Sequence, residues 1–204
     1  GYTYGLHGTP TTFLLEERIA TLEGGTDTLL APSGLAAITL VDMALLQSGD
    51  EVLIPDNAYG PGKELARQEL SRWGIGHRFY DAMNPDALTT MIGPTTKLVW
   101  LEAAGSVTME FPDLNWLVQA AKSRGVLTAL DNTWGAGIAF RPFELGIDVV
   151  MQALTKFPSG GGDVLMGSVT TRDVALHERI KLSHMHLGLG VAANDAELLL
   201  RSLP

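Results

Sequence analysis

The stretch KLVWLEAAGSVTMEFPDLNWLVQAAKSRGVLTALD, residues 97–131, decides the fold class of this chain. It opens on the apolar run Lys97–Leu101, which predicts a buried strand. The segment Asp113–Arg124 predicts a helix that stops at the glycine after it. A second apolar run, Val126–Leu130, predicts another strand, and Asp131 follows it directly. Two short apolar strands joined by a helix are typical of a parallel sheet that is covered by helices.

The same alternation extends from this unit toward both ends of the chain. Further strands are predicted over Thr28–Ala31, Val52–Pro55, His77–Tyr80, Val149–Leu154 and Val164–Thr170. Further helices are predicted over Thr11–Leu22, Leu35–Leu46, Lys63–Trp73 and Pro85–Met91, and the pattern is helical again after the last strand. No linker or repeat divides the sequence. Residues 1–204 are therefore expected to form one α/β domain, a mostly parallel sheet with helices on both faces.

Composition narrows the classes of protein to which the chain can belong. Its 204 residues, 46% hydrophobic, suffice for a large domain with its own core. The net charge of −9 disfavours nucleic acid and anionic membrane as partners. The absence of cysteine excludes disulfides, zinc–thiolate sites and a cysteine nucleophile, and no metal site is predicted. No apolar run reaches the ~18 residues that span a bilayer, and no signal peptide is visible. A chain without cysteine fits a reducing cytoplasm, which is the expected location.

Candidate functional residues follow the predicted strands, and in open α/β sheets ligands bind at the carboxyl ends of strands. Ser33 and Gly34 lie between a strand and a helix, where a glycine allows close approach and free N–H groups attract phosphate. The alternative is that Ser33 caps the helix. Asp131 ends an apolar strand, where a buried carboxylate needs a partner such as a protonated pyridine nitrogen. A cap or a turn residue is the alternative there.

Two further residues complete the set. Lys156 is the only one of five lysines predicted at the end of an apolar strand, and the glycine-rich segment Phe157–Gly162 follows it. A lysine held in a dry site becomes a nucleophilic amine, whereas an ordinary lysine before a loop is the alternative. Tyr59 follows another strand, and its ring either stacks on a flat cofactor or packs within the protein.

Taken together, the four groups match the requirements of pyridoxal 5'-phosphate (PLP). They supply an anion cradle, a ring platform, a counter-ion for the ring nitrogen and, 25 residues after Asp131, the amine of Lys156 for the aldehyde. A nucleotide-binding α/β domain that uses Ser33 and Gly34 is an alternative from another class. No Gly-x-Gly-x-x-Gly motif opens a helix here, which weakens that alternative.

Three segments resemble those of the Cys/Met-metabolism PLP-dependent enzymes, which have the aspartate-aminotransferase fold (fold type I). Gln152–Lys156 resembles that family's lysine motif, and Asp131–Gly137 its aspartate motif. Glu102–Glu110 is most similar to the Glu-x-x-Gly-Ser-x-Thr-x-Glu segment of the cystathionine β-lyases, where γ-synthases and γ-lyases usually carry Asn-Pro. The resemblance implies a carbon–sulfur lyase that converts cystathionine to homocysteine, pyruvate and ammonia by α,β-elimination.

The resemblance also implies roles for individual residues. Lys156 would be the Schiff-base lysine and proton shuttle, Asp131 the partner of the pyridine nitrogen, and Tyr59 the stacking ring that helps with proton transfer. The phosphate would be bound by Ser33, by the backbone N–H groups of Gly34 and Leu35, by the hydroxyl of Thr155, and by Tyr4 from the neighbouring subunit. A homotetramer is expected, and a C-terminal small domain with the arginine for the substrate carboxylate is expected to lie outside residues 1–204.

Two positions depart from the family's pattern. Leu6 stands where an arginine usually binds the phosphate, and Ala153 stands where a serine usually precedes the lysine. The alternatives within the family are a γ-lyase, a γ-synthase or a cysteine desulfhydrase, because they share the PLP residues. A non-enzymatic PLP-binding protein is the alternative outside it, and the presence of both Lys156 and Asp131 argues against it.

Overall fold

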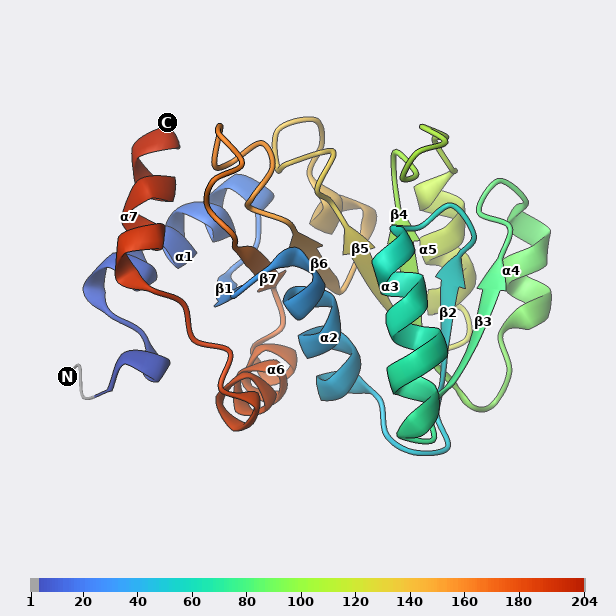
Figure 1. Ribbon diagram of the computed structural model, residues 1–204. Coiled ribbons are helices and arrows are strands. Elements are labelled where there is room, and N and C mark those ends of the chain that lie inside the picture. The colour runs from blue at the N-terminus through green and yellow to red at the C-terminus, as the bar shows by residue number, and fades with distance from the viewer. Residues whose placement is uncertain (1–3, 204) are drawn as a thin grey trace.

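The computed structural model describes residues 4–203 (Figure 1). Its strands are β1 (Asp27–Ala31), β2 (Glu51–Pro55), β3 (Gly76–Tyr80), β4 (Thr96–Glu102), β5 (Leu127–Asp131), β6 (Val149–Gln152) and β7 (Gly167–Thr171). They form one seven-stranded sheet in the order β1-β7-β6-β5-β4-β2-β3. Neighbouring strands are parallel except at β7, which is antiparallel to both β1 and β6. The expectation of a mostly parallel sheet is confirmed.

Helices cover both faces of the sheet, as expected. The α-helices are α1 (Pro10–Glu23), α2 (Gly34–Leu45), α3 (Gly60–Leu65), α4 (Pro85–Met91), α5 (Leu114–Lys122), α6 (Val174–Leu187) and α7 (Ala193–Ser202). The shorter turns are η1 (Gly5–His7), the π-helical η2 (Ala66–Leu70) that continues α3, and η3 (Pro142–Leu145). Helices α2, α3 and α6 lie in front of the sheet in Figure 1. The other α-helices pack on the opposite face or around the β1 end. Across residues 4–203, no helix is both long and apolar enough to cross a membrane.

The strands are apolar at successive positions because both of their faces are buried. In β4, Leu98 and Trp100 contact the core under α2, whereas Val99 and Leu101 contact the core under α4 and α5. The β1 strand divides in the same way, since Leu29 packs toward α2 and Leu30 packs with α1 and α7. A hydrogen bond of 2.8 Å between the hydroxyls of Thr28 and Thr170 joins β1 to β7 inside this core.

The direction of the strands decides where the loops meet. Because β7 alone is reversed, β1 runs in the same direction as β2, β4, β5 and β6. The loops that follow these strands therefore share one edge of the sheet, the upper edge in Figure 1. The opposite, amino edge carries the starts of the same strands.

Two of the predicted strands differ from the observed strands by more than one residue at an end. The strand predicted over Val149–Leu154 ends at Gln152, because the next backbone N–H, that of Ala153, donates to the Thr133 hydroxyl at 2.9 Å. Lys156 therefore lies in a turn, four residues beyond the strand, and the prediction that it ends a strand is wrong. The strand predicted over Val164–Thr170 is observed over Gly167–Thr171.

Candidate active site

Two acidic residues end adjacent strands at the carboxyl edge of the sheet. Glu102 is the last residue of β4 and Asp131 is the last residue of β5, and the two are paired in the parallel register. Residues paired in this way project their side chains from the same face of a sheet. Tyr59, the residue before α3, approaches this pair through its backbone N–H, which donates to the Glu102 carboxylate at 2.8 Å.

A small hollow of about 20 Å³ lies beside this pair. Its lining comprises Ile38, Asp42, Ile54, Pro55, Ala58, Tyr59, Gly62, Trp100, Leu101, Glu102 and Asp131. Within the described part of the chain, the lining includes three carboxyl groups and no lysine or arginine. The structure thus brings together two residues predicted from sequence, Tyr59 and Asp131. The Tyr59 side chain lies at the rim and is 41% exposed.

Asp131 has little within the chain to balance its charge. Its carboxylate accepts one backbone hydrogen bond, from the N–H of Thr133 at 3.0 Å. Burial raises the pKa of Asp131 above its ordinary value, against the opposing hydrogen bonds from Thr133. A cation that enters the hollow stabilises this carboxylate, because the attraction between the two charges offsets the cost of burying the carboxylate away from water.

Sequence reasoning missed the other two acids of the hollow. The sequence patterns predicted no separate role for Glu102 or for Asp42. Burial, and next the Asp131 carboxylate, raise the pKa of Glu102 to about 7. Burial also raises the pKa of Asp42 to about 7, although its carboxylate accepts a 2.8 Å hydrogen bond from the indole N–H of Trp100. One feature of the sequence could have identified Glu102: like Asp131, it follows directly after an apolar run that predicts a strand.

The turn at Ser33 and Gly34 is tightly packed. The Ser33 hydroxyl accepts a 3.0 Å hydrogen bond from the backbone N–H of Ala36, so the capping role is observed. A Cβ atom on Gly34 would lie 2.7 Å from the Cβ of Ala153, and one on Gly167 would lie 2.4 Å from the Ser33 carbonyl oxygen. Glycine is thus needed at both positions for packing within the chain. The first N–H groups of α2 precede its first intrahelical hydrogen bond.

The turn after β6 is stabilised by Thr155. The Thr155 hydroxyl donates to the carbonyl of Met166 at 3.2 Å and accepts from the Met166 N–H at 3.0 Å. Its single proton is therefore engaged, and its predicted role at a phosphate requires that this hydrogen bond be exchanged. Lys156 is exposed and, among residues 4–203, its ammonium makes no hydrogen bond or ion pair. The expectation of a dry environment for this lysine is wrong in this structure.

A buried glutamate connects the two loops on which Asp131 and Lys156 lie. Glu23, the last residue of α1, is fully buried and accepts hydrogen bonds from the amides of Asn132 at 2.8 Å and Gln152 at 2.6 Å. Burial raises the pKa of Glu23 to about 7, against these two hydrogen bonds. Because Asn132 follows Asp131 and Gln152 ends β6, Glu23 fixes the starts of both loops.

The remaining predicted residue and one departure from the family pattern lie away from the hollow. Tyr4 precedes η1, is 64% exposed and contacts the ring of His7 edge-on. Leu6 lines a separate groove of about 510 Å³ between the N-terminal segment, α1 and α6. No partner subunit is present, so the predicted contact of Tyr4 with a neighbour stays a prediction.

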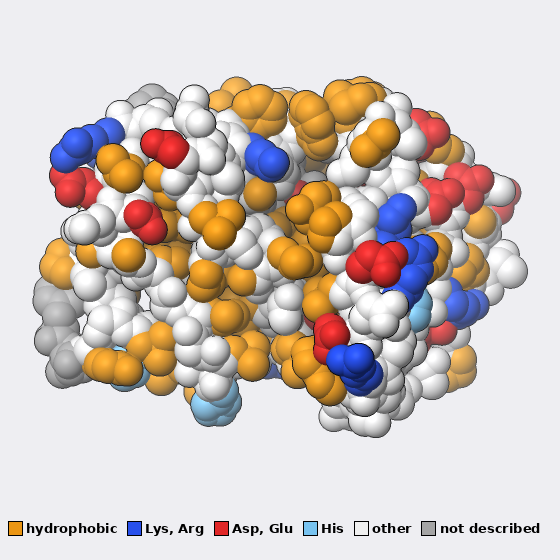
Figure 2. Space-filling model, in the orientation of Figure 1, with side chains coloured by type: hydrophobic (Ala, Val, Ile, Leu, Met, Phe, Trp, Pro, Cys, Tyr) orange, Lys and Arg blue, Asp and Glu red, His pale blue; other side chains and the backbone are white. Residues whose placement is uncertain are grey.

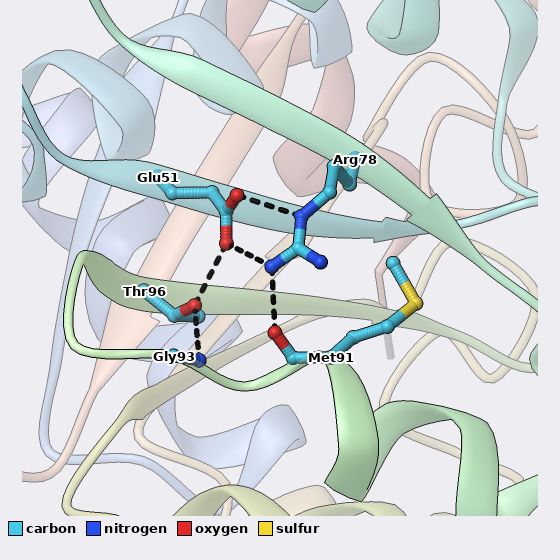
Figure 3. A network of polar contacts seen from close by, with 5 residues as sticks. All are labelled: Glu51, Arg78, Met91, Gly93 and Thr96. Carbon is cyan, nitrogen blue, oxygen red and sulfur yellow. Dashed lines mark hydrogen bonds and ion pairs between the residues drawn. The ribbon is translucent and has the colours of Figure 1, made fainter.

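The opposite edge of the sheet carries an acidic residue with a different environment (Figure 3). The Glu51 carboxylate, at the start of β2, accepts two 2.7 Å hydrogen bonds from the guanidinium of Arg78 and one of 2.8 Å from Thr96. Arg78 also donates to the carbonyl of Met91 at 2.6 Å. The hydrogen bonds from Arg78 lower the pKa of Glu51.

The fold and the carboxyl edge define an α/β domain of the kind that binds a cofactor at its strand ends. Along residues 1–204 the sequence matches the family described as Cys/Met metabolism PLP-dependent enzyme. The chain belongs to this family.

Individual relatives agree with this assignment. The chain is 43% identical to a cystathionine β-lyase of Bordetella avium, over 98% of this chain and 50% of that protein. It is 38% identical to the cystathionine β-lyase MetC of Bacillus subtilis, over 99% and 52%. The crystal structure of a cystathionine γ-synthase from Xanthomonas oryzae pv. oryzae superposes with a TM-score of 0.95 at 35% identity, over 99% and 52%. The chain thus spans about half the length of the relatives it matches.

Proposed function

We propose that the complete protein is a PLP-dependent carbon–sulfur lyase that converts cystathionine to homocysteine, pyruvate and ammonia by α,β-elimination. The observation that carries the proposal is the pair of strand-end carboxyls, Glu102 and Asp131, in a hollow bordered by Tyr59. Relatives with 43% and 38% identity are named cystathionine β-lyase, which supports the choice of reaction.

The residues at the carboxyl edge fit the cofactor. Asp131 is a desolvated carboxylate beside a hollow without a cationic lining residue, and a protonated ring nitrogen supplies the missing charge. The leading N–H groups of α2, at Gly34 and Leu35, together with Ser33, suit the phosphate because a helix start attracts anions. Thr155 is assigned to the phosphate as well, after its hydroxyl leaves Met166. When bound, the cofactor supplies an electron sink for the negative charge that develops at the substrate α-carbon.

The roles of the chain's own residues follow from their chemistry. Asp131 holds a proton on the ring nitrogen, because an ionised carboxylate next to that atom favours its cationic form. Tyr59 orients the ring from the rim of the hollow. Lys156 provides the amine that holds the cofactor covalently and then moves the α-proton at its Nζ atom. Its exposed turn leaves this amine accessible to an incoming aldehyde.

The proposed active site also requires parts outside this chain. Apolar side chains gather along the upper edge in Figure 2, above the loops that follow β4, β5 and β6. The most exposed members on these loops are Val107, Phe111, Ile138, Phe157 and Leu165. An apolar rim of this kind supports burial against another part of the assembly. A homotetramer in the cytoplasm, in which Tyr4 reaches a neighbour's phosphate and a C-terminal domain binds the substrate carboxylate, is part of the proposal.

A γ-lyase or a γ-synthase is the second candidate. The similarity to the cystathionine γ-synthase from Xanthomonas oryzae pv. oryzae supports it, because that protein shares the fold at 35% identity. The segment Glu102–Glu110 favours the β-lyase, since it lacks the Asn-Pro pair that is usual in the γ-enzymes. The two candidates differ in their products.

The test uses the full-length protein loaded with PLP and supplied with cystathionine. A β-lyase releases homocysteine and pyruvate, whereas a γ-lyase releases cysteine and 2-oxobutanoate. Borohydride reduction followed by peptide mapping is expected to place a phosphopyridoxyl label on Lys156. A label on another lysine would refute the assignment of Lys156, and 2-oxobutanoate as the main keto acid would refute the β-elimination.

A further inference from the structure

We propose that Glu102 is a positioning residue that shares a proton with Asp131 and connects this carboxyl to the loop that carries Tyr59. The inference rests on the proposed function, because it assumes that a cationic ring binds beside Asp131. It extends that function by assigning a role at the ring site to Glu102 as well as Asp131. The proton that Glu102 carries can be counted when the cofactor binds.

The first step is the cross-strand geometry. Glu102 and Asp131 are register partners at the ends of the parallel strands β4 and β5, and both line the hollow. Parallel neighbouring strands lie about 4.8 Å apart, so the two carboxyls leave the sheet side by side on one face. Glu102 is only 4% exposed. Two carboxyls at neighbouring strand ends in a desolvated site do not both ionise readily, so the pair retains a proton.

The second step concerns the hydrogen bonds of Glu102 itself. One carboxylate oxygen accepts the backbone N–H of Tyr59 at 2.8 Å, and the other accepts the hydroxyl of Ser106 at 2.5 Å. The same side chain therefore contacts the start of α3, the loop after β4 and, across the register, Asp131. A displacement of the Glu102 carboxyl moves the backbone of Tyr59, because hydrogen bonds of this length tolerate little change.

The third step is a second connection between the same two loops, which provides a control. Asn57 lies two residues before Tyr59, and its side-chain amide donates a 3.2 Å hydrogen bond to the Glu110 carboxylate. A Cβ atom on Gly105 would lie 2.4 Å from the Asn57 amide nitrogen, so this glycine allows the two loops to approach. Glu110 holds the Tyr59 loop as Glu102 does, but it is absent from the lining of the hollow.

The charge of the surroundings fixes the direction of proton movement. The ionisable groups that line the hollow together with Glu102 are Asp131 from β5, Asp42 from α2 and Tyr59 from the start of α3. None of them is a cation, and burial together with Asp131 raises the pKa of Glu102 to about 7. A cationic ring beside Asp131 reverses this effect and expels the shared proton.

The experiment counts protons when PLP binds to the full-length apoprotein. Calorimetry at about pH 7, in buffers of different ionisation enthalpy, gives the number of protons exchanged per site. Because burial and Asp131 raise the pKa of Glu102 to about 7, part of the Glu102 population is protonated at this pH, and the wild type is expected to release a measurable fraction of a proton more than Glu102→Gln. The control Glu110→Gln, which alters the other loop connection, is expected to match the wild type.

The outcomes separate the inference from the proposed function. Equal proton release by the wild type and Glu102→Gln overturns the shared proton, whereas a wild type that does not bind PLP refutes the proposed function itself. If Glu102→Gln fails to fold, a ¹³C carboxyl titration of the wild-type apoprotein decides the question. A glutamate that titrates near neutral pH and shifts to lower pH on addition of PLP is expected, and the lack of such a resonance overturns the inference.

Discussion

The two edges of the sheet hold acidic residues in opposite electrostatic states. At the amino edge, Arg78 binds Glu51 through two 2.7 Å hydrogen bonds and lowers the pKa of that carboxyl (Figure 3). At the carboxyl edge, Glu102 and Asp131 line a hollow that, over residues 4–203, includes no basic side chain, and both pKa values are raised. The amino edge is balanced within the chain and stabilises the fold. The carboxyl edge lacks a basic partner within the described residues and relieves its charge by keeping a proton or by binding a cation, which is the property expected of a binding site.

The largest effect is expected where the carboxyl edge acts on the substrate. Replacing Lys156 with Ala removes the amine that is proposed to bind the cofactor and to move the α-proton. Turnover of cystathionine by the loaded full-length enzyme should fall about 10²–10⁴-fold or more, the usual contribution of a positioned acid–base group. Steady-state kinetics measure the loss. A decrease smaller than tenfold would transfer the role to another residue.

The second largest effect is expected for Asp131→Ala, which removes one of the buried carboxyls that distinguish the carboxyl edge. Asp131→Ala eliminates the proposed charge-assisted hydrogen bond to the ring nitrogen, and a bond of this kind is worth roughly 1.5–3 kcal/mol. Affinity for PLP should fall by about the corresponding 10–150-fold, and turnover should fall more than substrate binding does. Fluorescence titration with PLP and steady-state kinetics test the two parts. Unchanged affinity in this variant would show that Asp131 does not face the ring.

The next prediction concerns the pH dependence of stability and the buried Glu23, which accepts hydrogen bonds from residues at the starts of two loops at the carboxyl edge. Its pKa of about 7 in the folded protein exceeds the ordinary value of 4.5, so the folded state binds more protons between these two values. Stability from this group is therefore present at low pH and is lost as pH rises from about 4.5 to about 7. Glu23→Gln does not titrate, and relative to the wild type it should gain about 1–3 kcal/mol between about pH 5 and pH 8.

Urea unfolding of the apoproteins at the two pH values measures this gain. Glu17→Gln, which changes an exposed carboxylate on the same helix, serves as the control for replacing a carboxyl with an amide. If the difference between the wild type and Glu23→Gln does not change with pH, Glu23 is ionised throughout the range.

The smallest effect is expected at the amino edge. Arg78 is 45% exposed, so the net contribution of its ion pair with Glu51 is expected to be about 1 kcal/mol or less. Arg78→Ala should lower the free energy of unfolding by that amount and leave the affinity for PLP unchanged. This loss should shrink on acidification. Arg78 lowers the pKa of Glu51 in the folded protein, so the ion pair contributes its full stabilisation only above the ordinary pKa of a glutamate. The stabilisation disappears as the pH falls through the lowered pKa and Glu51 becomes protonated. A large loss of PLP affinity would mean that the two edges are coupled.

Most of the fold could be predicted because apolar periodicity and glycine positions specify elements locally. The strand at Val126–Leu130 and the helix at Asp113–Arg124 are both found within one or two residues of their predicted bounds. The strand before Lys156 was predicted too long. The apolar run continues past Gln152, but the backbone N–H groups of the following residues form hydrogen bonds outside the sheet. Thr133 and Met166 receive those bonds, and neither is visible from the local sequence.

The candidate site was predictable only in part, for a similar reason. Asp131 and Tyr59 were selected because each follows a strand, and the structure brings them to one hollow. The pairing of Glu102 with Asp131 depends on which strands are neighbours and in which register, and a single sequence does not contain that information. The contact of Gly34 with Ala153 likewise joins positions that are distant in sequence, so a glycine expected to face a ligand also faces the chain itself.

The reversed strand β7 has a consequence for how the chain is made. β1 pairs only with β7 in the sheet, and the hydroxyls of Thr28 and Thr170 meet across a sequence separation of 142 residues. A ribosome adds about 5–20 residues per second, so β1 waits roughly 7–30 s for its partner. During that interval its apolar residues and unpaired backbone are open to other chains. Helices α1 and α2 adjoin β1 in the sequence and pack against it, so they can cover its apolar residues before Gly167–Thr171 has been synthesised.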